Sequence, residues 1–98
     1  MIGFKVKETK DYTIIEFTTD GPISPREVRD IEPPIVDPKR GVVISGRGPI
    51  WFYGYLIHYY HFAKWVATYD PRLGGAVVVM SHDHDRKIRE GDVVEVQI

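Results

Sequence analysis

The sequence of 98 residues contains no cysteine, so disulfide bonds, thiolate catalysis and zinc-finger sites are excluded. Any bound metal must therefore be held by histidine or carboxylate side chains. An excess of positive charge is also missing, since thirteen Lys and Arg residues face fourteen Asp and Glu residues, a formal net charge of -1. This balance excludes the uniformly basic surface of proteins that coat long duplex nucleic acid. It still allows a local basic pocket for a small anion.

Long apolar runs are missing as well. The longest, around residues 50–57, is far shorter than the roughly 20 residues of a membrane span, and no signal-like segment opens the chain. We therefore expect no membrane association and a cytoplasmic location. Internal repeats are absent, and the proline-rich stretch at residues 33–38 is too short to separate two domains. Residues 1–98 are predicted to form a single domain.

The first half of the chain predicts a hairpin followed by a short helix. Apolar residues occupy every second position over residues 2–6, and Thr13, Ile15 and Phe17 alternate with Glu16, which is typical of two paired β-strands. Ser24, Pro25 and Glu27 form a capping box with proline at the first helical position. A helix of about two turns is expected there, ended by the next pair of prolines.

The second half predicts a strand, a loop, a helix and a strand. Continuous apolar residues indicate a strand at 41–45, a helix opens at Pro49 and runs to about residue 61, and a strand follows at 65–69. The two strands should lie parallel, joined by a right-handed crossover. Further strands are expected at residues 76–80 and 93–98. The predicted fold class is α/β, with a mixed sheet of about six strands and two helices.

The crossover helix lacks a charged face. Eight of the twelve aromatic residues fall between Trp51 and Trp65. A helix that is apolar all round cannot turn one side to water. One side is therefore expected to cover the sheet and the other to meet a second copy of the chain, which predicts a homodimer. The alternative is that tyrosine hydroxyl groups make the outer face polar enough for a monomer.

Two polar loops follow the predicted parallel strands. They are Ser45, Gly46, Arg47 and Gly48 after the first strand, and Asp70, Pro71 and Arg72 after the second. Ligands of open α/β sheets bind at this edge. Glycines allow close backbone approach, the next helix offers free N–H groups, and Arg47 and Arg72 can pair with phosphate oxygens. The pattern predicts a phosphate site, although Gly-x-Gly-Pro is also an ordinary turn from strand to helix.

All four histidines lie in the second half, at His58, His61, His82 and His84. His61 lies at the predicted helix C-terminus, where the helix dipole favours its protonated form, so it is either an acid–base group or a capping cation. His58 is interpreted as a histidine of the dimer interface. The tetrad from His82 to Asp85 is either a source of metal ligands or a solvated turn, and we expect one ligand from it.

Asp70 precedes a proline at a strand end, which is typical of a turn former that bonds its own backbone. Its place beside Arg72 also makes it a functional candidate. A carboxylate combined with imidazole suits Mn²⁺ or Mg²⁺, because these ions keep open positions for phosphate oxygens. Such an ion would stabilise charge that develops on a phosphodiester.

The chain resembles a known family. The sequences GVVISGRGPIW at residues 41–51, YDPRLG at 69–74 and REGDV at 89–93 closely resemble the small CRISPR-associated proteins of the Csx-three type. This resemblance implies a distant relative of the CARF domains, with a Rossmann-like homodimeric α/β fold that binds cyclic tetra-adenylate. It further implies a Mn²⁺-dependent ring nuclease that opens this second messenger and ends the type III CRISPR response.

By the same resemblance, His61, Asp70 and Arg72 match positions tied to catalysis, and His82 matches a metal-associated histidine. Asp70 and His82 are therefore the expected Mn²⁺ ligands, although His84 leaves the choice of histidine open. Residues 45–48 match the ligand-binding loop.

In that family a second dimer closes over the ligand, so that binding and cleaving residues come from opposite dimers. Two other functions stay open for this chain. One is a non-catalytic sensor of cyclic oligoadenylate, and the other is a Mn²⁺-dependent exoribonuclease that acts on RNA 3′ ends.

Overall fold

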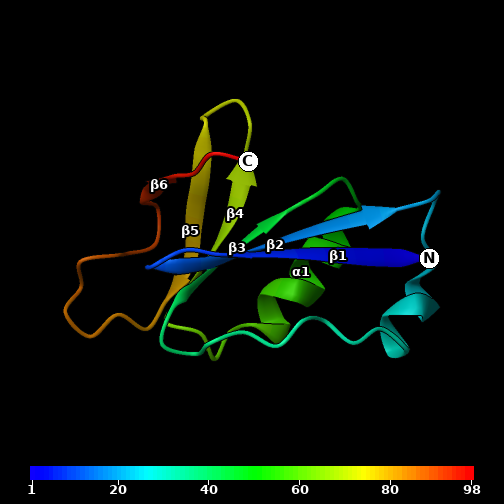
Figure 1. The fold of residues 1–98 in the computed structure, drawn as a ribbon, viewed down its shortest axis with the longest axis horizontal. Helices are drawn as coiled ribbons and strands as arrows, with labels where there is room; N and C mark the ends of the chain where they lie inside the picture. The colour runs from blue at the N-terminus through cyan, green and yellow to red at the C-terminus, as the bar shows by residue number, and fades with distance from the viewer.

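The six strands of the sheet lie side by side in the order in which the chain makes them (Figure 1). The computed structural model describes residues 1–98. The strands are β1 (Ile2–Glu8), β2 (Tyr12–Thr19), β3 (Gly41–Ser45), β4 (Trp65–Asp70), β5 (Gly75–Ser81) and β6 (Val93–Glu95). β2, β3 and β4 are parallel, whereas the other neighbours are antiparallel. The predicted hairpin, the parallel pair and the mixed six-stranded sheet are confirmed.

The prediction of two helices is only half right. The crossover helix α1 (Ile50–Tyr59) is present, but the N-terminal element η1 (Pro25–Arg29) is a 3-10 helix of five residues. Its capping box is there: the backbone N–H of Ser24 donates to the Glu27 carboxylate at 2.6 Å, and the Ser24 hydroxyl accepts from Arg26 N–H. None of its residues is buried, so no apolar stripe supports a longer α-helix.

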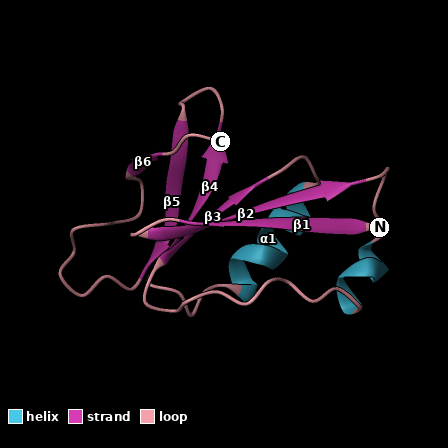
Figure 2. Ribbon diagram, viewed as in Figure 1, coloured by secondary structure: helices cyan, strands magenta, loops and turns pink.

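One core cluster lies between the sheet and α1. Phe52, Leu56 and Tyr60 are fully buried against side chains of β2, β3 and β4. The Tyr60 hydroxyl donates to the carbonyl of Pro34 at 2.7 Å, which fastens the proline-rich segment, and burial raises the pKa of this phenol. Figure 2 shows both helical elements on the same side of the sheet. α1 therefore covers the β2–β4 part of this face.

A second core cluster lies on the opposite face of the sheet. Its buried members are Ile14, Val43, Trp65, Ala67, Ala76, Val78 and Val96. β6 ends at Glu95 rather than at the predicted residue 98, because Glu95 pairs with Gly75, the residue at which the partner strand β5 begins. No helix combines the length and the apolar character that crossing a membrane requires.

Candidate functional site

The parallel strands β3 and β4 bring two of the predicted loops together. Ser45 ends β3 and Asp70 ends β4, so both loops leave the same edge of the sheet. A cavity of about 200 Å³ lies between them, lined by Ser45, Gly46, Arg47, Tyr53, Tyr69 and Pro71. The two loops are neighbours, as the sequence predicts, and their role in ligand binding stays a prediction.

The loop of residues 45–48 packs against the aromatic ring of Phe17. A Cβ at Gly46, whose φ is 148°, would lie 2.6 Å from the carbonyl oxygen of Phe17, and one at Gly48 would lie 2.8 Å from the Phe17 ring. The Tyr53 hydroxyl donates to the Gly46 carbonyl at 2.7 Å, and burial raises the pKa of Tyr53. The glycines thus make room for Phe17, while Arg47 is left exposed above the loop.

Asp70 forms the turn that the sequence predicts. Its carboxylate accepts a hydrogen bond from the backbone N–H of Arg72 at 2.9 Å, and the Arg72 Nε lies 3.5 Å from the same oxygen. The Arg72 side chain is 90% exposed, whereas that of Asp70 is 29% exposed. The turn therefore presents a guanidinium group to solvent with a carboxylate beside it.

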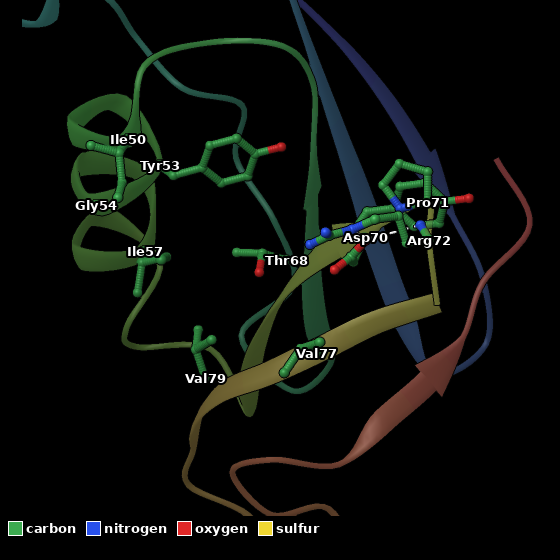
Figure 3. A pocket seen from close by; sticks show the side chains of 11 residues that line it. Ile50, Tyr53, Gly54, Ile57, Thr68, Asp70, Pro71, Arg72, Val77 and Val79 are labelled. Atoms are coloured by element: carbon green, nitrogen blue, oxygen red, sulfur yellow. Dashed lines mark hydrogen bonds and ion pairs between the residues drawn. The ribbon is translucent and has the colours of Figure 1, made fainter. Parts of the chain in front are cut away.

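A groove of about 690 Å³ extends from this edge between α1 and the β4–β5 hairpin. Its apolar walls are formed by Ile50, Tyr53 and Ile57 of α1 and by Val77 and Val79 of β5. In Figure 3, Asp70 and Arg72 lie across the groove from Tyr53, with Thr68 between them. The first turn of α1 carries no acidic residue, and Pro49 provides no side-chain cap. Free backbone N–H groups of the helix therefore remain available to an anion.

The predicted histidines gather at the opposite end of the molecule. The rings of His58 and His61 stack at a centroid distance of 5.8 Å, and the His61 and His82 rings are 6.4 Å apart. The His61 Nδ1 lies 3.2 Å from the carbonyl oxygen of His58, which fits the capping alternative for His61. The His82 Nε2 lies 2.9 Å from the His61 carbonyl oxygen and ties β5 to the end of α1.

The length of β4 separates these histidines from Asp70. Trp65 pairs with Ser81 and Asp70 pairs with Gly75, so His82 follows β5 back to the start of β4. At about 3.3 Å per residue, β4 spans roughly 16 Å. One chain therefore does not bring His61 or His82 to Asp70 and Arg72.

The sequence matches the family described as CRISPR-associated protein (Cas_csx3) over residues 16–95. The chain belongs to this family. An uncharacterized protein of Aquifex aeolicus (strain VF5) is 45% identical to it over 100 residues, which cover 97% of this chain and 88% of that protein. The Cas_csx3 match includes both polar loops and all four histidines, so the resemblance drawn from the motifs is confirmed.

The Cas_csx3 resemblance implies Mn²⁺, with Asp70 and His82 as its expected ligands. No three side chains of His, Asp or Glu converge in the structure. Because Asp70 ends β4 whereas His82 follows β5 and lies beside the start of β4, the two residues do not fit one ion within a single chain. His84 and Asp85 are exposed in a turn, as the alternative of a solvated turn requires, but Asp83 is buried.

Three residues at the Cas_csx3 loop edge were not singled out from the sequence. Tyr53, Thr68 and Tyr69 line the two cavities. Tyr53 lies one turn into the helix that follows the glycine loop, and Thr68 and Tyr69 directly precede Asp70. Position relative to the loops is therefore the signal that could have identified them.

Proposed function

We propose that this protein is a ring nuclease that binds and opens cyclic tetra-adenylate and so switches off type III CRISPR signalling. Membership of the Cas_csx3 family supports the CRISPR setting. The observation that carries the proposal is the edge at which Arg47, Arg72 and the N-terminus of α1 surround adjoining cavities.

This edge has the chemistry that a cyclic oligonucleotide needs. Guanidinium groups form charge-assisted hydrogen bonds with phosphate oxygens, and free N–H groups at a helix start add donors. Asp70 holds the Arg72 side chain beside the groove, at 3.5 Å. Adenine rings are flat and apolar on their faces, so Tyr53, Tyr69 and the aliphatic groove walls suit them.

A homodimer of the CARF-related type is part of this proposal. Cyclic tetra-adenylate has twofold symmetry and can lie on the axis of a twofold dimer, where it meets equivalent groups from both chains. Ile50 is 88% exposed and Trp51 is 38% exposed at the start of α1, beside the groove. Contact of these side chains with a second copy would remove them from water.

Ring opening in this proposal combines residues of different copies. Arg72 of one copy neutralises charge on the scissile phosphate, and His61 of another supplies the proton-transfer group, because one chain holds them far apart. Mn²⁺ dependence stays a prediction, since Asp70 and His82 can share an ion only where two chains meet.

The proposal is tested by incubating the protein with cyclic tetra-adenylate, with and without Mn²⁺, and separating linear products by chromatography. Arg72→Ala should weaken binding or turnover by about one to two decades, the value of a charge-assisted contact to phosphate. His61→Ala should still bind the ring but lose turnover by about 10² or more. Binding is measured by titration calorimetry.

Mixing the two variants tests whether both residues act in one chain. An equimolar mixture of Arg72→Ala and His61→Ala should regain activity, because some assemblies pair an intact Arg72 with an intact His61. Each variant alone at doubled concentration is the control. Ring binding without opening by wild type indicates the sensor instead, and trimming of linear RNA 3′ ends indicates the exoribonuclease.

A further inference from the structure

Five of the thirteen basic side chains line one cavity, at the edge away from the 45–48 loop. They are Lys10, Lys39, Arg40, Lys64 and Lys87, and the cavity has a volume of about 390 Å³. We call it the amino-edge cavity, because it lies at the amino ends of the parallel strands β2, β3 and β4. They come from the β1–β2 turn, the turn before β3, the link from α1 to β4, and the β5–β6 loop. Figure 1 shows the β1–β2 turn and the β5–β6 loop on the same side of the molecule. The basic residues of this chain, whose net charge is -1, are therefore concentrated locally around this cavity.

The four lysine ammonium groups of this cavity have no carboxylate partner. Only its arginine forms an ion pair, with Arg40 Nε lying 3.7 Å from Asp37. Three carboxylates, Asp11, Asp83 and Asp85, also line the cavity, but none lies within 4.0 Å of a lysine nitrogen. The cavity therefore keeps positive charge that no side chain neutralises at close range.

The buried carboxylate among these three is committed to the backbone. Asp83 is 5% exposed, and its oxygens accept hydrogen bonds from the N–H groups of Asp85, Lys87 and Ile88 at 3.3, 3.0 and 2.9 Å. This network fixes the loop that carries Lys87 to the cavity. Lys64 also acts on Asp83 through its positive charge, whereas Lys10, Lys39 and Lys87 form no ion pair within 4.0 Å and can meet an external anion.

The walls of the cavity are tied together by backbone hydrogen bonds. Gly41 N–H donates to the Asp11 carbonyl at 3.1 Å, and Lys64 N–H donates to the Arg40 carbonyl at 3.2 Å. The Arg40 guanidinium also donates to the Thr9 carbonyl at 3.0 Å. The chain segments that carry the lysines are therefore already positioned before any ligand arrives.

The cavity also has an aromatic wall. The rings of Tyr12 and Trp65 lie 6.0 Å apart, and Ile88 and Val94 continue this apolar side. Trp65 is buried, while Tyr12 is half-buried and reaches the cavity surface. Basic groups beside an aromatic face suit a ligand that has both a phosphate and a flat ring.

We propose that the amino-edge cavity binds a phosphate-bearing nucleotide. Its phosphate lies among Lys10, Lys39, Lys64 and Lys87, and its base packs against Tyr12. Ammonium groups bind phosphate as point charges, and the cavity volume of about 390 Å³ is within the range of small-ligand sites. This site is separate from the Arg47–Arg72 edge and does not rest on ring-nuclease activity.

Tryptophan fluorescence gives a direct test of binding. The chain has two tryptophans, so Trp51→Phe leaves Trp65, in the cavity wall, as the only reporter. Titration of this variant with adenosine monophosphate should give a saturable change. Inorganic phosphate should bind more weakly, because it lacks the base, and adenosine should give no change over the same range.

Charge-removing variants in the Trp51→Phe background locate the site. Lys64→Ala with Lys87→Ala should weaken adenosine monophosphate binding about tenfold or more. Lys10→Ala with Lys39→Ala should act in the same direction and leaves the groups around Asp83 untouched.

Two controls complete the test. Lys5→Ala with Lys7→Ala removes the same charge from β1, outside the cavity lining, and Arg72→Ala alters the other edge. Both should leave the affinity near that of the parent. The proposal is overturned by the absence of a saturable change, by equal affinity for adenosine or for inorganic phosphate, or by equal weakening in a control variant.

Discussion

The carboxylate of Asp83 organises the loop between β5 and β6. It accepts three backbone hydrogen bonds, while the hydroxyl of the neighbouring Ser81 donates to the Ile88 carbonyl at 2.7 Å. The Ile88 N–H, followed by the Asp85 N–H, the positive charge of Lys64 and the Lys87 N–H, holds the pKa of Asp83 below its ordinary value of 3.8. The ionised form is therefore the one that the folded chain stabilises.

This lowered pKa makes the stability of the protein depend on pH. Ionised Asp83 contributes fully above its ordinary pKa, and the contribution is lost as the pH falls through the lower value of the folded state. Asp83→Asn should lower the urea midpoint near pH 7, with a difference from wild type that narrows as the pH falls below the ordinary value of 3.8. Asp85→Asn removes an exposed carboxylate and should leave the midpoint near wild type. A difference that stays constant with pH would contradict this role.

The sequence predicts the structural role of Asp70 but not that of Asp83. A following proline identifies Asp70 as a turn former, because the interaction is local and two residues long. The donors to Asp83 reach five residues ahead, to Ile88, and their convergence depends on the tertiary packing of Ile88 against the second core. From the sequence, the tetrad of residues 82–85 therefore could not reveal which of its members is buried.

The packing of β3 against β4 depends on a missing side chain. A Cβ at Gly41 would lie 2.1 Å from the indole of Trp65, and both residues are buried. Gly41→Ala should lower the free energy of unfolding by about 1–3 kcal/mol, since the buried indole or the strand must move to relieve this contact. Gly54→Ala in α1 meets no atom within 4 Å and should raise it by roughly 0.5–1 kcal/mol. Urea denaturation followed by circular dichroism measures both, and the reverse order would refute this account.

The bounds of the elements could be predicted where hydrophobic periodicity decides them. β3 satisfies this condition, because its continuous apolar residues are buried over the predicted range of 41–45. β2 extends beyond the predicted residues 13–17 to Tyr12–Thr19, and it also buries Ile14, because both faces of the sheet are covered there. The capping box before η1 indicates where a helix begins but not how far it extends, and η1 buries no residue that would lengthen it. β6 ends early because its partner strand β5 begins at Gly75, which pairs with Glu95.

The candidate site could be predicted in part from the order and direction of the strands. β3 and β4 are parallel neighbours, so the 45–48 loop and Asp70 lie side by side whatever their side chains are. The proximity of the two loops therefore follows from the order of the elements. The separation of His82 from Asp70 follows from the antiparallel β4–β5 hairpin, which returns the chain to the start of β4. The sequence predicts this turn, but a shared metal site needs distances that only the register provides.

Exposed apolar side chains run along α1 and onto β5. Ile50 is 88% exposed and Val79 is 42% exposed, on either side of the groove. We expect a homodimer that covers them, so Ile50→Glu should weaken dimerisation roughly tenfold or more, because a charge would be buried without a partner. Ile35→Glu is the matched control, since Ile35 is 96% exposed in the proline-rich segment. Sedimentation at micromolar concentration measures both, and a monomeric wild type would rule out the dimer.

The two outermost strands of the sheet, β1 and β6, have features that oppose pairing with strands of other chains. β1 pairs only with β2 and contains the exposed Lys5 and Lys7, while β6, the outermost strand on the other side, is three residues long. An unpaired strand is a template for strands of other chains, and charged or very short edges oppose such growth. The protein can therefore offer apolar faces for assembly into closed oligomers while resisting the strand-by-strand addition that builds amyloid-like fibrils.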